Sequence, residues 1–373
     1  MCLQQASVLN FQITLESSTT RRYGKLNAIS NTPLFMNLKS LFLLILLAPV
    51  LTFADSNTLV IASWNVENLF DTIDDPANPN DDGYTPDGWT HWSTYRYTRK
   101  LSHLAKVIAS MKPDILCLLE VENRLVLKDL VAALKKEQNY ELPVIIHRDC
   151  QDTRGIDVAM LAKVAPIATN WFCAVPLQRD VLTCDFAIQE RSITVLANHW
   201  KSQLGKKEES DDIRRTEAKA VRKFINSRLD KNPEAAILVT GDFNDMVNSP
   251  ILLQTAGFSL SEELVRTNTA KRLLWNLSGT LPETTRGTYY YAAAKRWSSF
   301  DSISVSPGLL TNSVPSASWL VKPESYSIFK YPDHVDTNGV PRPFRYIRSK
   351  VDGNRMVMGF SDHFPVRVEL KAE

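Results

Sequence analysis

Carboxylate, amide and imidazole side chains stand at the ends of several short apolar segments of this sequence. The residues at these ends are Asn65, Glu120, Asn198, His199, Asp242 and Asn244. Asp301 and the pair Asp362-His363 stand at the start of two further segments. A charged or strongly polar group at the end of a buried strand is unfavourable unless it is paired, protonated or bound to a metal ion. Because the pattern recurs from strand to strand, it indicates one shared site.

The residue types at these positions indicate the chemistry of phosphate esters. In Gly-Asp-Phe-Asn (241–244), the two-residue period of a strand places Asp242 and Asn244 on one face, where both can address one group. The possible metal ligands among these residues are mainly carboxylate and amide oxygens, which favour Mg²⁺, Mn²⁺ or Ca²⁺ over Zn²⁺. Two histidines could transfer protons near neutral pH.

Alternating short strands and longer helices must position these residues. Apolar periodicity predicts helices over Thr94–Met111, Arg124–Gln138 and Lys206–Leu229. Strands are predicted over Leu59–Val66, Asp114–Val121, Pro143–His147, Ile156–Ala162, Ile193–Asn198, Ala236–Thr240, Ser299–Val305 and Phe364–Leu370, with a further hairpin that contains Cys173 and Cys184. Strands outnumber helices, which indicates two packed sheets with helices outside rather than a doubly wound parallel sheet.

The order of the motifs resembles that of the endonuclease/exonuclease/phosphatase superfamily. The matching segments are Ser-Trp-Asn-Val-Glu-Asn (63–68), Leu-Leu-Glu-Val-Glu-Asn (118–123), Ala-Asn-His-Trp-Lys-Ser (197–202), Gly-Asp-Phe-Asn-Asp (241–245), Ser-Phe-Asp-Ser-Ile (299–303) and Ser-Asp-His-Phe-Pro-Val (361–366). The resemblance implies an α/β fold, a four-layer α-β-β-α sandwich of two mixed sheets with outer helices, as in deoxyribonuclease. It also implies one catalytic domain over residues 55–373.

The resemblance also implies roles for individual residues. Glu120 would be the principal ligand of Mg²⁺, Mn²⁺ or Ca²⁺, with Asn65 and Asp362 nearby. Asp242 would orient or deprotonate the attacking water, and Asn244 would hold a phosphoryl oxygen. His199, and His363 oriented by Asp301, would stabilise the transition state or protonate the leaving oxygen. Arg154 and Asn198 would contact phosphate.

The leading prediction is a metal-dependent endonuclease that hydrolyses DNA, with RNA as a second nucleic acid. His199 stands where exonuclease III has a tyrosine, which brings the resemblance closer to deoxyribonucleases and sphingomyelinases. Looser motifs resemble bacterial predicted extracellular nucleases. The alternative is a phosphodiesterase or phosphatase that acts on lipid or small-molecule phosphate esters. A catalytically inactive binding module is a minor alternative. No stable protein partner is predicted.

Three other features leave alternatives open. The aspartates at 71, 74, 75, 81, 82 and 87 could hold a structural Ca²⁺, but their spacing does not fit an EF-hand, and a solvated loop is the preferred interpretation. A basic cluster over residues 201–223 could follow a nucleic-acid backbone or form a solvated helix face. Tyr289, Tyr290, Tyr291 and Trp297 could stack on bases or simply pack.

The cysteines suggest one disulfide. Cys117 lies inside an apolar run and is expected to be a buried small hydrophobe, whereas Cys173 and Cys184 lie on two strands joined by a turn. In an oxidising compartment these two residues could form a disulfide bond.

The N-terminal region predicts export. The apolar run Leu41–Phe53 is too short for a bilayer span, follows Lys39, and ends at small residues, which is typical of a signal peptide over residues 36–54 cleaved after Ala54. Residues 1–35 would be an unstructured upstream extension before the true start at Met36. The protein would then be secreted or periplasmic, with no membrane span after cleavage. The formal net charge of +2 offers no global argument for nucleic acid.

Overall fold

The computed structural model describes residues 57–76, 78, 80–310, 319–348 and 353–372. The expected extension over 1–35 and the signal peptide over 36–54 lie outside these residues. The described residues, all of which follow Leu51, form one compact unit. Across the described ranges, no helix has the length and apolar character that a membrane crossing requires.

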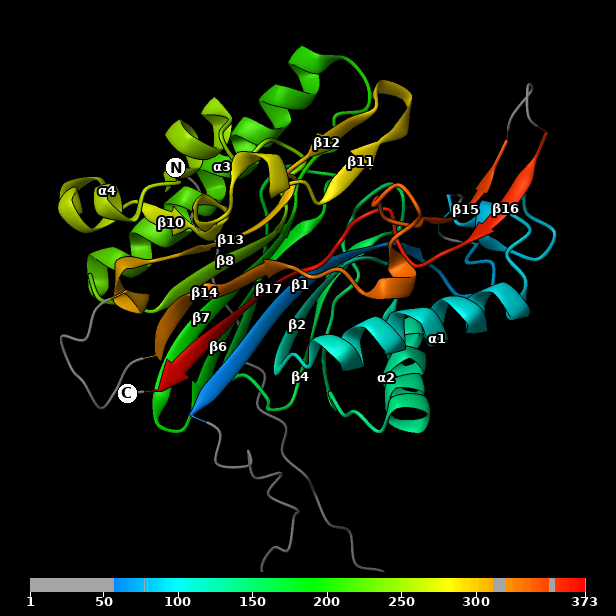
Figure 1. Cartoon of the computed structure of the whole chain (residues 1–373), viewed down its shortest axis with the longest axis horizontal. Helices are drawn as coiled ribbons and strands as arrows, with labels where there is room; N and C mark the ends of the chain where they lie inside the picture. Colours follow the sequence, from blue (N-terminus) through cyan, green and yellow to red (C-terminus); the bar gives the residue numbers. More distant parts are fainter. Residues whose placement is uncertain (1–56, 77, 79, 311–318, 349–352, 373) are drawn as a thin grey trace, which may run out of the picture. The chain divides into compact units, whose positions relative to one another are not determined.

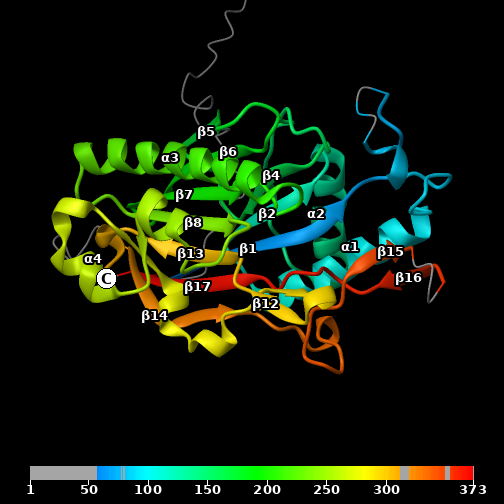
Figure 2. The same ribbon diagram turned by 90° about the horizontal axis from the view of Figure 1, so that it is seen from above.

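Two mixed sheets form the centre of this unit (Figures 1 and 2). Within the described residues, the first sheet has six strands in the order β14 (Trp319–Ile328), β17 (Val366–Ala372), β1 (Thr58–Leu69), β2 (Ile115–Val121), β4 (Asp157–Ala162) and β3 (Val144–Ile146). The second has seven, in the order β5 (Ala168–Cys173), β6 (Asp180–Ile188), β7 (Arg191–His199), β8 (Ile237–Asp242), β13 (Asp301–Val305), β10 (Leu274–Asn276) and β9 (Phe258–Ser259).

Helices cover the outer faces of both sheets. Figures 1 and 2 show α1 (Thr94–Met111) and α2 (Arg124–Gln138) on the side of β1 and β2, and α3 (Lys207–Lys231) on the side of β7 and β8. The short helix α4 (Glu262–Thr267) and a π-helical turn over Ile251–Ala256 follow β8 in the chain. Two hairpins complete the fold: β11 (Tyr289–Tyr291) with β12 (Arg296–Ser298), and β15 (Phe344–Ile347) with β16 (Arg355–Met358).

The apolar side chains explain why these layers stack. In β2, Cys117 and Leu119 join the core between the two sheets, whereas Leu116 and Leu118 join the core beneath α1 and α2. Val239 of β8 belongs to a third core beneath α3. A strand with both faces covered must be apolar at nearly every position, as the sequence of β2 is. The four-layer α-β-β-α sandwich is therefore confirmed.

Candidate active site

The register of the second sheet brings three of the candidate side chains to neighbouring positions. In the parallel pair β7–β8, His199 lies opposite Asp242, and in the antiparallel pair β8–β13, Asp242 lies opposite Asp301. Asp242 therefore stands between His199 and Asp301 on adjacent strands. All three residues are buried. The first sheet contributes Asn65 and Glu120 from its parallel strands β1 and β2.

His363 reaches this cluster from the loop that precedes β17. Its Nδ1 lies 2.7 Å from Asp301 Oδ2, and its Nε2 lies 3.8 Å from Asp242 Oδ2. Burial alone would lower the pKa of His363, but the carboxylates of Asp301 and Asp242 outweigh burial and raise the pKa well above its usual value. The imidazole is therefore held in its protonated form at neutral pH, with Nε2 directed toward Asp242.

His199 has the opposite electrostatic environment. Its Nε2 lies 3.8 Å from both Glu120 Oε1 and Asp242 Oδ2, and its Nδ1 is buried without a hydrogen-bond partner in the described part of the chain. Burial lowers the pKa of His199 well below its usual value, and the positive charges of Arg179, Arg154 and His363 lower it further. His199 is therefore neutral, so one protonated and one neutral imidazole flank the same carboxylate.

Asp242 is held in place by two amides. Asn65 Nδ2 donates to Oδ2 at 3.0 Å, and the backbone N–H of Asn244 donates to Oδ1 at 2.8 Å. Burial, reinforced by the negative charge of Asp301, raises the pKa of Asp242 to about 7. A carboxyl group with this pKa can accept or release a proton near neutral pH.

The backbone around Asp242 leaves room only for glycine at position 241. Gly241 has φ +141°, and an added Cβ would lie 1.9 Å from the carbonyl oxygen of Asn198. Asn244, two residues beyond Asp242, donates from Nδ2 to the carbonyl of Trp200 at 3.0 Å. The second N–H of this amide makes no hydrogen bond to any residue that the structure describes.

Glu120 offers an oxygen to a cation. The residue has φ +64°, a conformation that is unfavourable for a residue with a side chain and is typical of constrained sites. Its Oε2 accepts the backbone N–H of Asn68 at 3.0 Å, while Oε1 faces Arg154 at 3.7 Å and His199 at 3.8 Å, too far for hydrogen bonds. An oxygen with only long contacts, beside further carboxylate and amide oxygens, fits a hard divalent cation.

Glu67, Lys100 and Arg345 were not expected at the site. The Arg345 guanidinium pairs with the carboxylates of both Glu67 and Asp362, and Lys100 Nζ donates to the Glu67 carbonyl at 3.1 Å. Burial lowers the pKa of Lys100 to about 8, although the carboxylates of Glu67, Asp362 and Glu120 oppose that shift. Glu67 lies inside the Trp-Asn-Val-Glu-Asn motif, which could have indicated it, whereas no motif surrounds Arg345.

The structure corrects the expectation for Asn198. This residue is fully buried, its Nδ2 donates to the carbonyl of Thr240 at 3.2 Å, and its Oδ1 accepts from Trp200 Nε1 at 3.3 Å. Successive side chains of a strand point to opposite faces, so Asn198 points away when His199 points into the site. Arg154, by contrast, lies beside Glu120 and donates to Asn68 Oδ1 at 2.7 Å.

The disulfide expected between Cys173 and Cys184 is also wrong. The two residues do lie on an antiparallel hairpin, but Cys173 pairs with Asp180 and Cys184 pairs with Thr169. The ladder thus separates the cysteines by about 13 Å along the strands, whereas a disulfide requires Cα atoms roughly 4.4–6.8 Å apart. Cys173 is exposed, Cys184 is buried, and both are free thiols.

Of the two segments that could contact nucleic acid, the basic cluster is largely paired with acidic residues, whereas the aromatic segment lies beside the site. Ion pairs with Glu209, Asp211 or Asp212 are formed by Lys206, which precedes α3, and by Lys207, Arg214 and Arg215 on α3, so neighbouring acids neutralise much of this helix. The aromatic segment forms the β11–β12 hairpin beside the site. The ring of Tyr289 lies 4.9 Å from that of His363, and Tyr291 is 47% exposed.

Comparisons with known proteins find structures of similar fold and one matching protein family. The solved structures of similar fold include humanized D. rerio TDP2 with 14 mutations, at 15% identity and a TM-score of 0.51 over 85% of this chain and 100% of that chain. Truncated Caenorhabditis elegans TDP2 matches at 17% identity and 0.47 over 84% and 98%, and the Bacteroides thetaiotaomicron mannosyl-6-phosphatase Bt3783 at 18% and 0.47 over 84% and 99%. No curated protein sequence matches significantly. Residues 60–372 match the model of the endonuclease/exonuclease/phosphatase family, whose members hydrolyse phosphoric esters, and the chain belongs to that family.

Proposed function

We propose that this protein is a divalent-metal-dependent phosphodiesterase whose substrate is DNA. The observation that carries the proposal is the pair of histidines with opposite charge states on either side of Asp242. Hydrolysis of a phosphodiester requires an activated water, donors for the non-bridging oxygens and a proton for the leaving oxygen. The protein's own side chains can supply each of these.

Each step is assigned to a residue with a suitable environment. Asp242, with its pKa of about 7, orients the attacking water and accepts its proton. The free N–H of Asn244 donates to a phosphoryl oxygen. His363, kept protonated by Asp301, gives its Nε2 proton to the leaving oxygen. His199, which is neutral, donates or accepts one hydrogen bond at the phosphoryl group without adding a charge.

The metal ion would be held by Glu120, Asn65 and Asp362. Their donors are carboxylate and amide oxygens, which suit Mg²⁺ or Mn²⁺ and also accept Ca²⁺. When bound, such an ion supplies positive charge that stabilises the phosphoryl oxygens in the transition state. Arg345 pairs with Asp362, and Arg154 lies beside Glu120, so each of these two carboxylates has a positive charge next to it.

Two features at the site support DNA as the substrate. The side chains of Arg154 and Arg345 are 45% and 41% exposed, so each can present positive charge to a phosphate of the backbone. The exposed ring of Tyr291 lies on the hairpin whose first residue, Tyr289, contacts His363. Aromatic rings stack on bases regardless of their sequence. RNA offers the same phosphates and bases and is the second substrate to test.

We also propose that the protein is exported through a signal peptide over residues 36–54 and acts in the periplasm or outside the cell. This part rests on the amino-acid sequence alone. N-terminal sequencing of the exported protein should begin at Asp55. A sequence that starts within residues 1–35 would contradict it.

The experiment measures cleavage of plasmid DNA, RNA, sphingomyelin vesicles and bis(4-nitrophenyl) phosphate with Mg²⁺, Mn²⁺ or EDTA. We expect metal-dependent DNA cleavage that is lost in His199→Ala and Asp242→Ala and retained in Asp212→Ala, which alters an exposed carboxylate on α3. Cleavage of lipid without DNA would overturn the choice of substrate. Full activity of both His199→Ala and Asp242→Ala would overturn the assignment of the site.

A further inference from the structure

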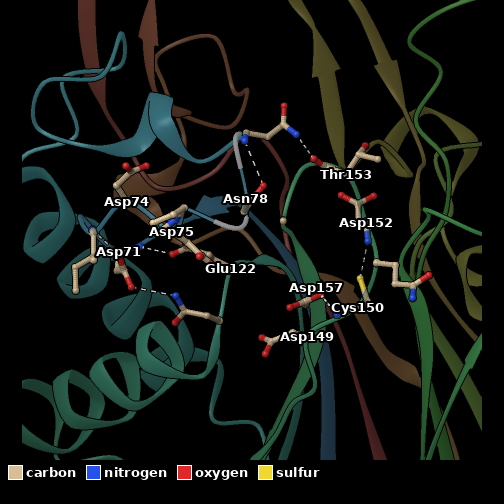
Figure 3. A pocket seen from close by; sticks show the side chains of 16 residues that line it. Asp71, Asp74, Asp75, Asn78, Glu122, Asp149, Cys150, Asp152, Thr153 and Asp157 are labelled. Atoms are coloured by element: carbon tan, nitrogen blue, oxygen red, sulfur yellow. Dashed lines mark hydrogen bonds between the residues drawn. The ribbon is translucent and has the colours of Figure 1, made fainter.

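An acidic loop between β1 and α1 lies outside the proposed active site. Asp71, Asp74 and Asp75 from this loop face a cavity that Glu122 lines from the β2–α2 connection and Asp157 lines from β4 (Figure 3). The backbone N–H of Asp71 in this loop donates to Glu122 Oε2 in the β2–α2 connection at 2.7 Å. Acidic residues alone do not identify a binding site, because exposed carboxylates are common.

Three carboxylates of this loop lie close together. Asp74, Asp81 and Asp82 each offer an oxygen, and these oxygens all lie within 4.8 Å of one another. Ligands on opposite sides of one Ca²⁺ ion are separated by roughly 4.6–5.2 Å, twice the usual Ca–O distance. One ion can therefore contact all three oxygens. Without a cation, the three negative charges repel one another.

The middle member of this group provides a second, independent observation. Asp81 is only 1% exposed, although Asp74 and Asp82 are exposed. Its Oδ2 accepts the backbone N–H of Asp75 at 3.0 Å, but its Oδ1 is inaccessible to water and has no hydrogen-bond partner among the residues that the structure describes. A buried carboxylate oxygen that lacks both water and a donor is strongly unfavourable, and a bound ion is one of the standard explanations for such an atom.

We propose that Asp74, Asp81 and Asp82 bind a Ca²⁺ ion that is distinct from the catalytic metal. All the ligands are hard oxygens, which excludes a preference for softer transition metals. Ca²⁺ also tolerates the irregular geometry of a loop and completes its shell with waters or carbonyls, whereas Mg²⁺ demands a near-octahedral arrangement. The ion satisfies Asp81 Oδ1 and removes the repulsion among the three carboxylates.

The position of the loop gives this ion a role in organising the active site. Asn80 Nδ2 donates to the carbonyl of Thr153, and an added Cβ at Gly155 would lie 1.9 Å from Asn78 Nδ2, so the loop packs closely on residues 153–155. Arg154, within that segment, faces Glu120. A cation that fixes the loop next to Asn80 therefore fixes the backbone that presents Arg154.

The test measures binding of Ca²⁺ by calorimetry, and of Tb³⁺ by luminescence, in the full-length protein. Trp89 is a suitable sensitiser, because its indole packs against Gly83, next to Asp82. We expect wild-type protein to bind the ion and to gain thermal stability from Ca²⁺. Asp81→Asn and Asp82→Asn should each weaken binding at least tenfold, and the latter changes only an exposed residue, which protects the test against misfolding.

Two control variants separate this site from the catalytic one. Asp87→Asn removes an exposed carboxylate of the same loop outside the cluster and should bind Ca²⁺ as wild type does. Glu120→Gln removes the principal catalytic ligand and should retain the loop site together with its Tb³⁺ luminescence. Unchanged binding in Asp81→Asn and Asp82→Asn, binding lost only in Glu120→Gln, or no binding at millimolar Ca²⁺ would each overturn the proposal.

Discussion

Replacing Asp301 by asparagine should deprotonate His363, the proton donor of the proposed reaction, without removing any proposed metal ligand. Asp301 is 1% exposed, and its Oδ2 lies 2.7 Å from His363 Nδ1. The asparagine is nearly the same size but carries no charge. Burial, which favours neutral imidazole, is then opposed mainly by Asp242, so the pKa of His363 should fall.

The magnitude follows from the contribution of a positioned acid. General acid catalysis typically accelerates a reaction by about 10²–10⁴-fold, and the amide can also hold the imidazole in the wrong tautomer. We therefore expect kcat/KM for DNA to fall by roughly 10²–10⁴-fold in Asp301→Asn. This range corresponds to about 3–5 kcal/mol of lost transition-state stabilisation.

The assay compares two phosphodiesters that differ only in the leaving group, 4-nitrophenol or phenol. The 4-nitrophenolate anion leaves readily without a proton, so Asp301→Asn should lose far less activity on this ester than on the phenyl ester. Asp185→Asn serves as a matched control, because it neutralises another carboxylate of the second sheet, one that pairs with Arg228. Equal losses on the two esters would refute His363 as the acid, and wild-type activity on both would refute the Asp301–His363 coupling.

Three further predictions follow from other parts of the fold. Burial raises the pKa of Glu217 from 4.5 to about 7, so the unfolded chain binds fewer protons between these values and stability falls as pH rises through that window. The free energy of unfolding of Glu217→Gln, relative to that of wild type, should therefore be higher at pH 8 than at pH 5 by up to about 3 kcal/mol, as measured by urea unfolding. An equal difference at both pH values would contradict this prediction. Arg345→Met removes the guanidinium that pairs with the buried Glu67 carboxylate and should lower the free energy of unfolding by about 1–3 kcal/mol. An unchanged urea midpoint would contradict this prediction. Because Cys173 and Cys184 are free, a reducing agent should leave Tm unchanged, and a drop would indicate a disulfide.

The elements predicted best are those whose boundaries are encoded locally. The expected helices Thr94–Met111 and Arg124–Gln138 match α1 and α2 at both ends. Ser93 caps the first of these helices by accepting the N–H of Arg96, and Lys112 ends it in a left-handed conformation just before Pro113. Apolar periodicity and the proline are visible without knowledge of the tertiary structure.

Strand β14 was not predicted, because its sequence lacks a strand signature. It contains Pro323 and lies at the edge of the first sheet, where its ladder with β17 shifts register between Lys322 and Ser327. Proline in a strand is confined to edges and irregularities, so the segment resembles a loop when its neighbour is unknown. Pairing with β17, across a long sequence separation, decides its structure.

The same distinction applies to the candidate site. Asp242 and Glu120 were found because each follows a buried apolar strand, a local feature. Arg345 arrives on the β15–β16 hairpin, which is placed by the packing of Phe344 in the core beneath α1 and α2. Asn198 was expected to contact phosphate from the family resemblance, but strand alternation directs it to the face opposite that of His199.

The two histidines show why residue type alone does not assign an acid or a base. His199 and His363 each place Nε2 3.8 Å from Asp242 Oδ2, so distance to this carboxylate does not distinguish them. Their other neighbours do distinguish them. Asp301 stabilises the charged form of His363 and raises its pKa, whereas the positive charges of Arg179 and Arg154 add to burial in lowering the pKa of His199. Groups whose surroundings separate their pKa values can take opposite roles in one reaction. The protonated ring of His363 is the donor to the leaving oxygen, because it can release its Nε2 proton and keep the Nδ1 hydrogen bond to Asp301. The neutral ring of His199 has no such extra proton and serves the phosphoryl group instead.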